Sequence, residues 1–438
     1  MKTGGEYTTG DLLRFYLPLA LQFATMNLTF PIAGMVASAG PGGVSDYAGL
    51  IQAQQMMNFI STLGFGMMVT GMVHGKTIEG LRNYQAVNRM LMIAVIILQS
   101  LVSLTPLSHL IMGKILGMPV AIEKSGSLFL AFLIPFNFFV FTRNRYMVAL
   151  YLCRESGKAS IAAVQRIAST FVLSLVFRTV GLTGPLWAAI CVVIPVAVET
   201  LMIYLFARKH MCEFPKATGE VPGKKDIFFF NIPLSAGGIF LNLSSNLLAA
   251  FIARAADPEK MLPVYYLAQS LVAPMTFATN QLRTTVLTFP PKDKNDKRTL
   301  KFAAVIGLTF GLIPLIFIIP GPAEFYYVHA QNLDPALLND VRITAVLFAF
   351  LPLCTALRFQ SEGLAANLKS PVVTLAAQAV FLGMTTSTAF ITLSLGFKGN
   401  IIGPLCSIVA NICAMLMIRF ALDWSRRQKE ALATEEGV

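Results

Sequence analysis

The stretch DLLRFYLPLALQFATMNL, residues 11–28, decides how this chain folds, because a second copy of it follows 215 residues later. The second copy is DIFFFNIPLSAGGIFLNL, residues 226–243, and six of its eighteen positions are identical to the first. Composition alone would give about one or two identities. The same offset pairs Gln54 with Gln269. A constant offset of 215 in a chain of 438 residues is too long for a solenoid repeat. It indicates two copies of one unit, and hence two fused lobes.

The composition is that of a membrane protein. Hydrophobic residues make up 55% of the chain, charged residues only 13%, and the mean hydropathy is +0.66. A soluble protein of this length carries about twice that charged fraction. The apolar residues fall in runs of about 20 or more, which is long enough for helices that cross a bilayer. The first run is too long for a signal peptide and lacks a small-residue cleavage site, so it is expected to stay as the first span.

We therefore predict an all-α polytopic membrane protein with twelve transmembrane helices in two parallel six-helix lobes. The first lobe has spans near 12–38, 45–73, 86–106, 126–152, 159–180 and 183–207. The second has spans near 226–254, 262–289, 301–320, 341–366, 371–394 and 399–424. The predicted domains are an N-lobe over 1–207, a linker over 208–225, a C-lobe over 226–424 and a tail over 425–438. The linker and the tail are expected to be cytoplasmic.

The distribution of basic residues predicts the orientation in the membrane. Twenty lysines and arginines fall in loops on the side of the N-terminus, and seven fall on the opposite side. The positive-inside rule then places both termini in the cytoplasm, which agrees with an even number of spans. It also explains the net charge of +12, so no nucleic-acid partner is expected. We predict a monomer in the plasma membrane, which in a bacterium is the inner membrane. Two lobes that enter from the same side are related by an axis along the membrane normal, and transporters with this symmetry bind substrate between their lobes.

No motif indicates an enzyme, a cofactor or a metal site. The chain has no Walker A sequence, no HExxH and no GxSxG at a strand-to-helix turn. None of the six cysteines forms a CxxC pair, so they are interpreted as free thiols. No segment is long and polar enough for a nucleotide-binding domain. Any transport would therefore be passive or secondary.

Ionisable residues inside spans are costly and mark functional sites by default. Arg143 and Arg145 lie in the fourth span, Arg283 in the eighth, and Arg358 with Glu362 in the tenth. Because the fourth and tenth spans are equivalent in the two lobes, these arginines predict a cationic cavity suited to carboxylates or phosphates. The alternative is that they lie in the cytoplasmic third of their helices and extend to the membrane interface.

Two further groups are candidates for the transport pathway. Glu362 and Glu199 are candidate coupling sites for a proton or sodium ion, although a local ion pair with Arg358 is an alternative role for Glu362. Asn27, Asn242, Gln54 and Gln269 are polar residues repeated at equivalent places. They are expected either to bind substrate in a central cleft or to join helices by hydrogen bonds.

The chain resembles the multidrug/oligosaccharidyl-lipid/polysaccharide exporter superfamily, with its MATE-like transporters, in its twelve spans, its parallel lobes and the proline in the first span of each lobe. Within that superfamily it is most similar to the progressive ankylosis protein family. The residues that carry this likeness are Arg14-Phe15-x-x-Pro18-Leu19, Leu282-Arg283-x-x-Val286, the spacing of Pro352, Arg358, Gly363 and Lys369, and Gly396-x-x-Gly399. The resemblance implies a V-shaped bundle and export of organic anions such as citrate, pyrophosphate or nucleotides. Residues 425–438 do not resemble the long acidic C-terminal tail of the animal members.

The predicted function is transport of a small organic anion, outward, with Arg283, Arg358, Arg143 and Arg145 as ligands. A first alternative is a proton- or sodium-coupled multidrug antiporter, although the first and seventh spans carry acidic residues only at their starts, Asp11 and Asp226. A second alternative is a flippase for a lipid-linked saccharide, and a third is a scaffold or receptor that transports nothing.

Overall fold

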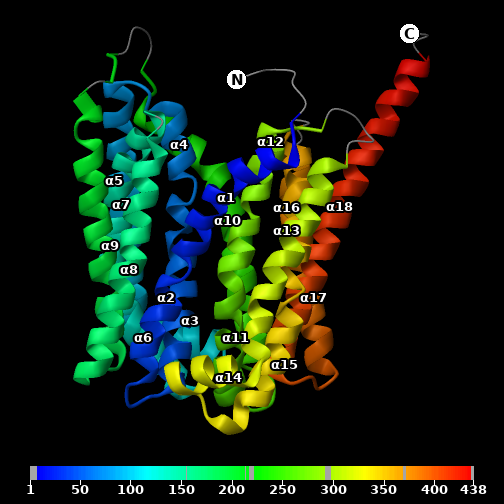
Figure 1. Ribbon diagram of the computed structural model, residues 1–438. Coiled ribbons are helices and arrows are strands. Elements are labelled where there is room, and N and C mark those ends of the chain that lie inside the picture. The colour runs from blue at the N-terminus through cyan, green and yellow to red at the C-terminus, as the bar shows by residue number, and fades with distance from the viewer. Residues whose placement is uncertain are drawn as a thin grey trace.

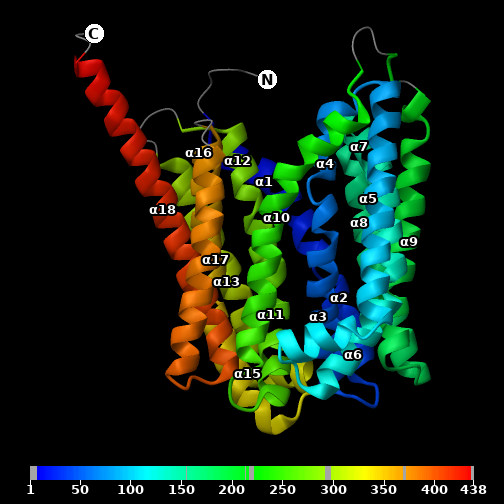
Figure 2. The same cartoon turned by 180° about the vertical axis from the view of Figure 1, so that it is seen from behind.

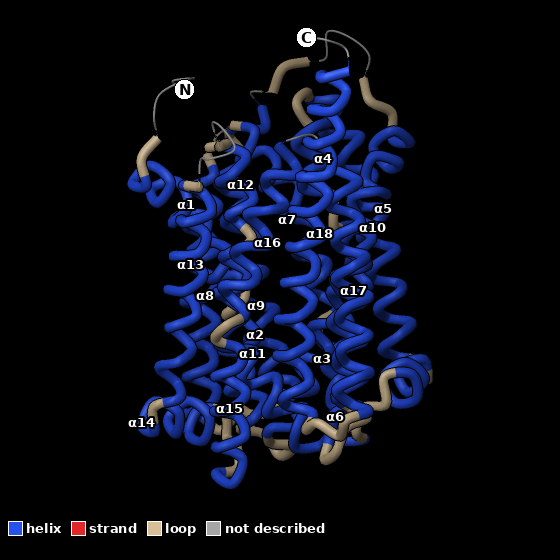
Figure 3. The backbone as a smooth tube through the Cα atoms, turned by 90° about the vertical axis from the view of Figure 1, so that its right-hand side faces the viewer, coloured by secondary structure: helices blue, strands red, loops and turns tan. Residues whose placement is uncertain are grey.

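The computed structural model describes residues 7–153, 155–212, 214–216, 221–291, 297–367 and 371–435. Regular structure within these ranges is entirely helical, and the helices run between two layers of loops (Figures 1 and 3). Ten helical segments are long and apolar enough to cross a membrane, and an eleventh is formed by two helices that meet at a bend of 43°. The predicted fold class is confirmed: the chain is an all-helical integral membrane protein.

The N-terminal half contains the predicted first six spans. Its elements are α1 (Thr9–Met26), α2 (Thr29–Ser38), α3 (Val44–Ile60), η1 (Ser61–Gly64), α4 (Met67–His74), α5 (Ile78–Leu104), the π-helix η2 (His109–Ile115), α6 (Val120–Phe132), α7 (Ile134–Leu152), α8 (Ser156–Val180), α9 (Pro185–Ala207) and η3 (His210–Cys212). The bent pair is α6 and α7, and the bend falls at Leu133, just before Pro135. A proline in the first turn of α7 has no N–H to donate to the preceding helix, which favours a break there.

The C-terminal half repeats this order. Its elements are α10 (Lys224–Ile252), α11 (Pro258–Thr279), α12 (Gln281–Thr288), α13 (Arg298–Leu315), η4 (Ile316–Ile318), α14 (Pro320–Ala323), the π-helix η5 (Glu324–Ala330), η6 (Pro335–Leu337), α15 (Leu338–Phe348), α16 (Leu351–Asn367), α17 (Pro371–Ser394) and α18 (Gly399–Glu435). Helix α18 continues beyond the predicted end of the last span at residue 424, into the predicted tail. The predicted linker and tail are described only in part.

The predicted span 262–289 differs most from expectation. It consists of α11 and α12, which are separated at Asn280, and it is not among the segments apolar enough to count as a span. The polar side chains of α11 face other helices: the Tyr266 hydroxyl donates to Gln52 at 2.7 Å, and Thr279 lies 2.9 Å from Thr355, hydroxyl to hydroxyl. A helix buried among other helices does not need an apolar surface toward lipid, so a hydropathy criterion alone does not identify it as a span.

The first helix of each half packs against the opposite half. In α1, Leu12, Tyr16 and Ala20 follow one another at a spacing of four and are buried in an apolar cluster with residues of α11, α12, α13 and α16. The Tyr16 hydroxyl donates to the carbonyl oxygen of Ala278 at 3.1 Å. In α10, the Asn231 side chain donates to the carbonyl oxygen of Leu63 at 2.8 Å. Figures 1 and 2 show α1 and α10 at the centre of the molecule, between the outer helices of both halves. The sequence did not predict this exchange.

The start of α1 and the end of α18 lie on the same face of the molecule, here called the terminal face (Figure 1). The opposite face, here called the distal face, carries the two π-helices η2 and η5. Their residue ranges differ by the repeat offset of 215. Each is followed by a residue with left-handed backbone, Gly117 with φ of 71° and Asn332 with φ of 52°, again 215 residues apart. The repeat read from the sequence is therefore reproduced in the local backbone.

Candidate functional site

Three charged side chains form a buried cluster in the N-terminal half, here called the N-cluster: Arg143 of α7, Arg166 of α8 and Glu199 of α9. Arg143 Nη1 lies 2.5 Å from Glu199 Oε2, and Arg166 Nη1 lies 3.1 Å from the same oxygen. All three residues are at most 5% exposed. Burial of a charge is tolerated only with a partner of opposite charge, so Glu199 is what holds two guanidinium groups inside this half.

A second charged cluster, here called the C-cluster, lies in the C-terminal half and contains Arg283 of α12 with Arg358 and Glu362 of α16. Arg358 Nε donates to Glu362 Oε1 at 2.9 Å, and its guanidinium carbon lies 4.4 Å from the ring centre of Phe381. Arg358 Nη1 also donates to Asn411 Oδ1 at 3.3 Å. Arg283 Nη1 lies 3.9 Å from Glu362 Oε2, which is a loose pair. The ion pair between Arg358 and Glu362 is the local pairing that the sequence offered as an alternative.

The two clusters are related by the repeat but differ in how they are neutralised. Arg143 and Arg358 are separated by the offset of 215, whereas Glu199 and Glu362 correspond to Ala414 and Met147 in the other half. In each cluster two guanidinium groups share one carboxylate, which leaves a formal surplus of one positive charge. The side chain of Arg283 is 46% exposed, while those of Arg143, Arg166 and Arg358 are at most 6% exposed. Within the two clusters, the surplus charge therefore reaches the surface at Arg283.

Arg143 and Arg358 are buried inside their own half, at 5% and 3% exposed. Arg145 is half-buried and interacts electrostatically with the exposed Arg82 and Arg89 of α5, outside the N-cluster.

The repeated polar residues have local partners. The Asn27 side chain donates to the Phe23 carbonyl at 3.1 Å, and the Asn242 side chain donates to the equivalent Gly238 carbonyl, also at 3.1 Å. The Asn242 side chain also donates to Thr62 Oγ1 at 3.1 Å, which links α10 to the N-terminal half. Gln54 and Gln269 are half-buried residues of α3 and α11, and the structure gives no side-chain hydrogen bond for either within the described ranges. Among these four, only Asn242 has a recorded side-chain hydrogen bond between the two halves.

A polar network between the halves was missed by sequence reasoning. Gln52 Oε1 accepts from the Tyr266 hydroxyl at 2.7 Å, and Gln52 Nε2 donates to Asn246 Oδ1 at 3.3 Å. Gln52 is fully buried, so this network holds α3 against α10 and α11. Gln52 is not repeated in the second copy, where Leu267 occupies the equivalent position, whereas Gln54 and Gln269 are a repeated pair. The signal available in the sequence was an amide residue inside an apolar span, two residues before Gln54.

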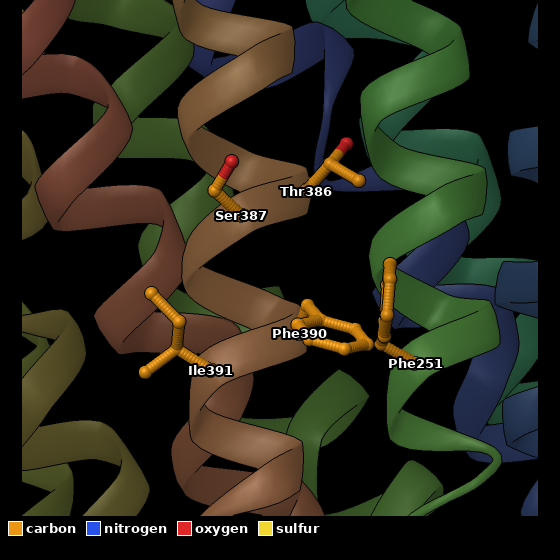
Figure 4. Close-up of a pocket in the computed structure, with 5 residues that line it drawn as sticks. All are labelled: Phe251, Thr386, Ser387, Phe390 and Ile391. Carbon is orange, nitrogen blue, oxygen red and sulfur yellow. The ribbon is translucent and has the colours of Figure 1, made fainter.

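The open groove of 440 Å³ between α10 and α17 is not part of either cluster (Figure 4). It is lined by Phe251, Thr386, Ser387, Phe390 and Ile391, so it carries no charge and includes none of the predicted site residues. Across the ranges that the structure describes, no group of three or more histidine, cysteine, aspartate or glutamate side chains is placed to hold a metal ion.

Comparison of the whole chain with solved structures gives matches over nearly its full length. The inward-facing conformation of a multidrug resistance MATE family transporter of the MOP superfamily has a TM-score of 0.69 and 15% sequence identity. The match covers 93% of this chain and 98% of that one. This chain has the fold of the MATE transporters. The eukaryotic MATE transporter AtDTX14 matches with a TM-score of 0.63 and 14% identity, over 97% of this chain and 98% of its own.

A third matching structure is a MOP superfamily transporter from Pyrococcus furiosus, described as having a binding pocket of reverse polarity that suggests a different function. Its TM-score is 0.57 at 16% identity, over 95% of this chain and 96% of that one. Neither a family model nor a curated protein sequence matches the chain. The MATE fold is thus supported by structural likeness, and the narrower resemblance to the progressive ankylosis family stays a prediction.

Proposed function

We propose that this protein is a secondary transporter that moves a small organic anion outward by alternating access. Three observations support the proposal: the membrane-spanning helices, the MATE fold, and the surplus positive charge in both clusters. In this proposal the moving units are the N-lobe, residues 1–207, and the C-lobe, residues 226–424. The linker 208–225 and the tail 425–438 lie in the cytoplasm, so the terminal face is the cytoplasmic one.

The observation that carries the choice of an anion is the state of Arg283. Its guanidinium is 46% exposed and only loosely paired with Glu362, at 3.9 Å. A guanidinium offers a planar set of donors that fits the two oxygens of a carboxylate or phosphate. An incoming citrate, pyrophosphate or nucleotide would therefore replace a weak internal partner with a strong external one.

The other candidate residues have supporting roles in the proposed site. Arg358, which is bonded to Glu362 and Asn411, adds a buried positive charge to the cluster that contains Arg283. Arg143 and Arg145 place positive charge in the opposite lobe, and Asn27, Asn242, Gln54 and Gln269 contribute polar groups along the pathway. Glu362 is the better coupling candidate, because its second oxygen faces the exposed Arg283, whereas Glu199 is enclosed by two buried arginines.

The multidrug antiporter remains the competing function, since the MATE fold is shared with a multidrug transporter. Such an antiporter needs a carboxylate that exchanges its proton or sodium ion. Asp11 accepts from the backbone N–H of Thr8 at 2.8 Å, and Asp226 accepts from that of Gly223 at 3.0 Å. Both carboxylates therefore cap the first turns of α1 and α10. This use of the two aspartates favours the anion over the cationic drug.

A thermal-stability panel on detergent-purified protein tests the proposal. Citrate, pyrophosphate and ATP are compared with lipophilic organic cations, since a ligand that binds only folded protein stabilises it by about 2.7 kcal/mol at one hundred times its Kd. Arg283→Ala should abolish stabilisation by the anion, and Arg283→Lys should retain part of it. The control is Lys398→Ala, which removes an exposed cation paired with Asp340 at 3.1 Å. Stabilisation by cations alone, unchanged in Arg283→Ala, supports the drug antiporter. If neither the anions nor the organic cations stabilise the protein, a lipid-linked substrate becomes the preferred proposal.

A further inference from the structure

Arg178, near the end of α8 in the N-terminal half, is bonded to the end of the π-helix η5 in the C-terminal half. Its Nη1 donates to the carbonyl oxygen of Ala330 at 2.5 Å, and its Nη2 donates to the carbonyl oxygen of His329. The side-chain oxygen of Asn332 lies 3.5 Å from the same Nη2. One guanidinium thus meets the last two carbonyls of η5 across the boundary between the halves.

Arg254 makes the reciprocal contact. It lies two residues after the end of α10, in the C-terminal half, and its guanidinium donates to the end of η2 in the N-terminal half. Nη2 donates to the Ile115 carbonyl at 2.6 Å, and Nη1 donates to the Leu116 carbonyl at 2.9 Å. A bond from Nη1 to the Ala250 carbonyl at 2.7 Å fixes the side chain against its own helix.

The two contacts have acceptor carbonyls at equivalent helix ends, but their arginine donors are not equivalent. Ile115 and Ala330, which end the two π-helices, are separated by the repeat offset of 215. Arg178 and Arg254 have no arginine at that offset: their counterparts are Leu393 and Ala39. The same structural feature is therefore capped by arginine twice, from two different places in the repeat. Because the last carbonyls of a helix lack partners and carry partial negative charge, a cation is well matched to them.

The left-handed residues that follow the π-helices allow the close approach. A Cβ atom at Gly117 would lie 3.3 Å from Arg254 Nη1, so glycine leaves room for the guanidinium. At the equivalent position, the Asn332 side chain donates to the Ser38 carbonyl at 2.9 Å, and the neighbouring Gln331 Nε2 donates to the Pro31 carbonyl at 3.1 Å. The segment after η5 is therefore also bonded to the N-terminal half. Both π-helices lie on the distal face, η2 next to α6 in Figure 2 and η5 next to α14 in Figure 1.

We propose that Arg178 and Arg254 form a reciprocal latch that holds the two halves together at the distal face, and that both must release before this face opens. The proposal deepens the alternating-access function and rests on it. Arginine suits this role because its planar guanidinium bonds two neighbouring carbonyls at once, which a lysine ammonium does less well. Two other ion pairs join residues within one half, Lys398 with Asp340 and His109 with Glu123, so they do not resist opening.

A distance measurement between spin labels on the distal face tests the latch without any substrate. The labels replace Leu104 at the end of α5 and Leu395 after α17, which are 68% and 69% exposed and belong to different halves. All six native cysteines are replaced first. In Arg178→Ala/Arg254→Ala, the ratio of long to short distances should rise by about tenfold or more, because each lost bond joins a charged donor to a carbonyl. Arg178→Lys/Arg254→Lys should give a smaller rise, and the control Lys398→Ala should give none.

An unchanged distance distribution in the folded double variant would overturn the proposal, as would an equal shift in Lys398→Ala. If the double variant is not recovered as folded protein, the single variants decide: each must raise the ratio, and no rise in either overturns the latch. The measurement is made in the absence of ligand. A wrong substrate class therefore leaves it unaffected, and a failed latch leaves the ligand panel unaffected.

Discussion

Arg143 and Arg358 occupy the same position in the two copies of the repeat, yet each is neutralised by a glutamate that the other copy lacks. Glu199 reaches Arg143 from α9, and Glu362 reaches Arg358 from the same helix, four residues away. A buried arginine at this position thus occurs in both halves, while its counter-charge comes from two unrelated places. The difference matters because Glu199 is enclosed, whereas Glu362 also faces the exposed Arg283.

The first prediction concerns Glu199→Gln. Removing this carboxylate leaves Arg143 and Arg166 buried without a counter-charge, and breaking a buried pair on one side costs about 3–5 kcal/mol. We expect a loss of that size in the free energy of unfolding, measured by denaturant or thermal unfolding in detergent.

The control for Glu199→Gln is Glu155→Gln, because Glu155 is 40% exposed in its side chain and pairs with Lys158 at 3.4 Å. An exposed pair contributes below about 1 kcal/mol. The triple variant Arg143→Met/Arg166→Met/Glu199→Leu should recover most of the lost stability, since apolar residues replace the whole cluster. Equal losses from Glu199→Gln and Glu155→Gln would contradict the assignment of the N-cluster as an internal ion pair.

The second prediction concerns Glu362→Gln and follows from the proposed anion site. Arg283 loses a carboxylate competitor at 3.9 Å, so an added anion should bind more tightly. A partly exposed pair contributes below about 1 kcal/mol, so we expect affinity for citrate or pyrophosphate to rise by about three- to fivefold. Titration of the thermal shift against anion concentration measures this. A decrease in affinity would show that Glu362 helps to bind the anion and does not compete with it.

The third prediction concerns helix packing at Gly49 of α3. A Cβ atom there would lie 2.7 Å from the Ser125 Cβ and 2.9 Å from the Gly126 backbone nitrogen, both in α6. Because backbone cannot move aside cheaply, Gly49→Ala should cost about 1–3 kcal/mol of stability. The matched control is Gly383→Ala in α17, which has open space around it and should be neutral or stabilising by about 0.4–1 kcal/mol. Thermal unfolding of both variants checks the difference, and a loss at Gly383 as large as at Gly49 would refute it.

The fourth prediction compares two buried tyrosines. The Tyr266 hydroxyl donates to the buried Gln52 side chain, so Tyr266→Phe leaves that oxygen without its donor and should cost about 1–3 kcal/mol. The Tyr84 hydroxyl is buried with no hydrogen-bond partner, so Tyr84→Phe removes an unsatisfied group and should be neutral or stabilising. Unfolding experiments on the two variants measure the contrast. If both variants lose the same stability, the network between the halves contributes nothing beyond packing.

Much of the fold was predictable because its determinants are local or periodic. Long apolar runs predicted the spans, and the offset of 215 between residues 11–28 and 226–243 predicted the repeat. Span 262–289 was predicted with the others, although the structure shows α11 and α12 there, which are not among the segments apolar enough to count as a span. Helices α1 and α10 were predicted as the first spans of their lobes. Their packing against opposite halves was not predicted, because no local sequence pattern shows which helices will pack against the buried faces of α1 and α10.

The candidate site was predicted only as a set of residue types. Arg143 and Arg358 were identified as unusual charges within spans, but their burial inside each half was not. Gln52 was missed because its counterpart in the repeat is a leucine. Arg178 and Arg254 were only counted among the seven basic residues on the side opposite the N-terminus. In each case the sequence did not show which residue of another helix would be the contact partner.

The sequence by itself determined the helical membrane-spanning class, the internal repeat and the polar residues that interrupt its apolar spans. Hydropathy and the offset between the two copies can be read from the chain alone, without knowing which helices become neighbours. The tertiary structure decided which carboxylate neutralises which arginine, which helix ends the two latch arginines cap, and that only Arg283 among the clustered arginines reaches the surface. These depend on side chains from helices far apart in the chain, because ion pairs and hydrogen bonds form at distances of about 3 Å that only packing can set.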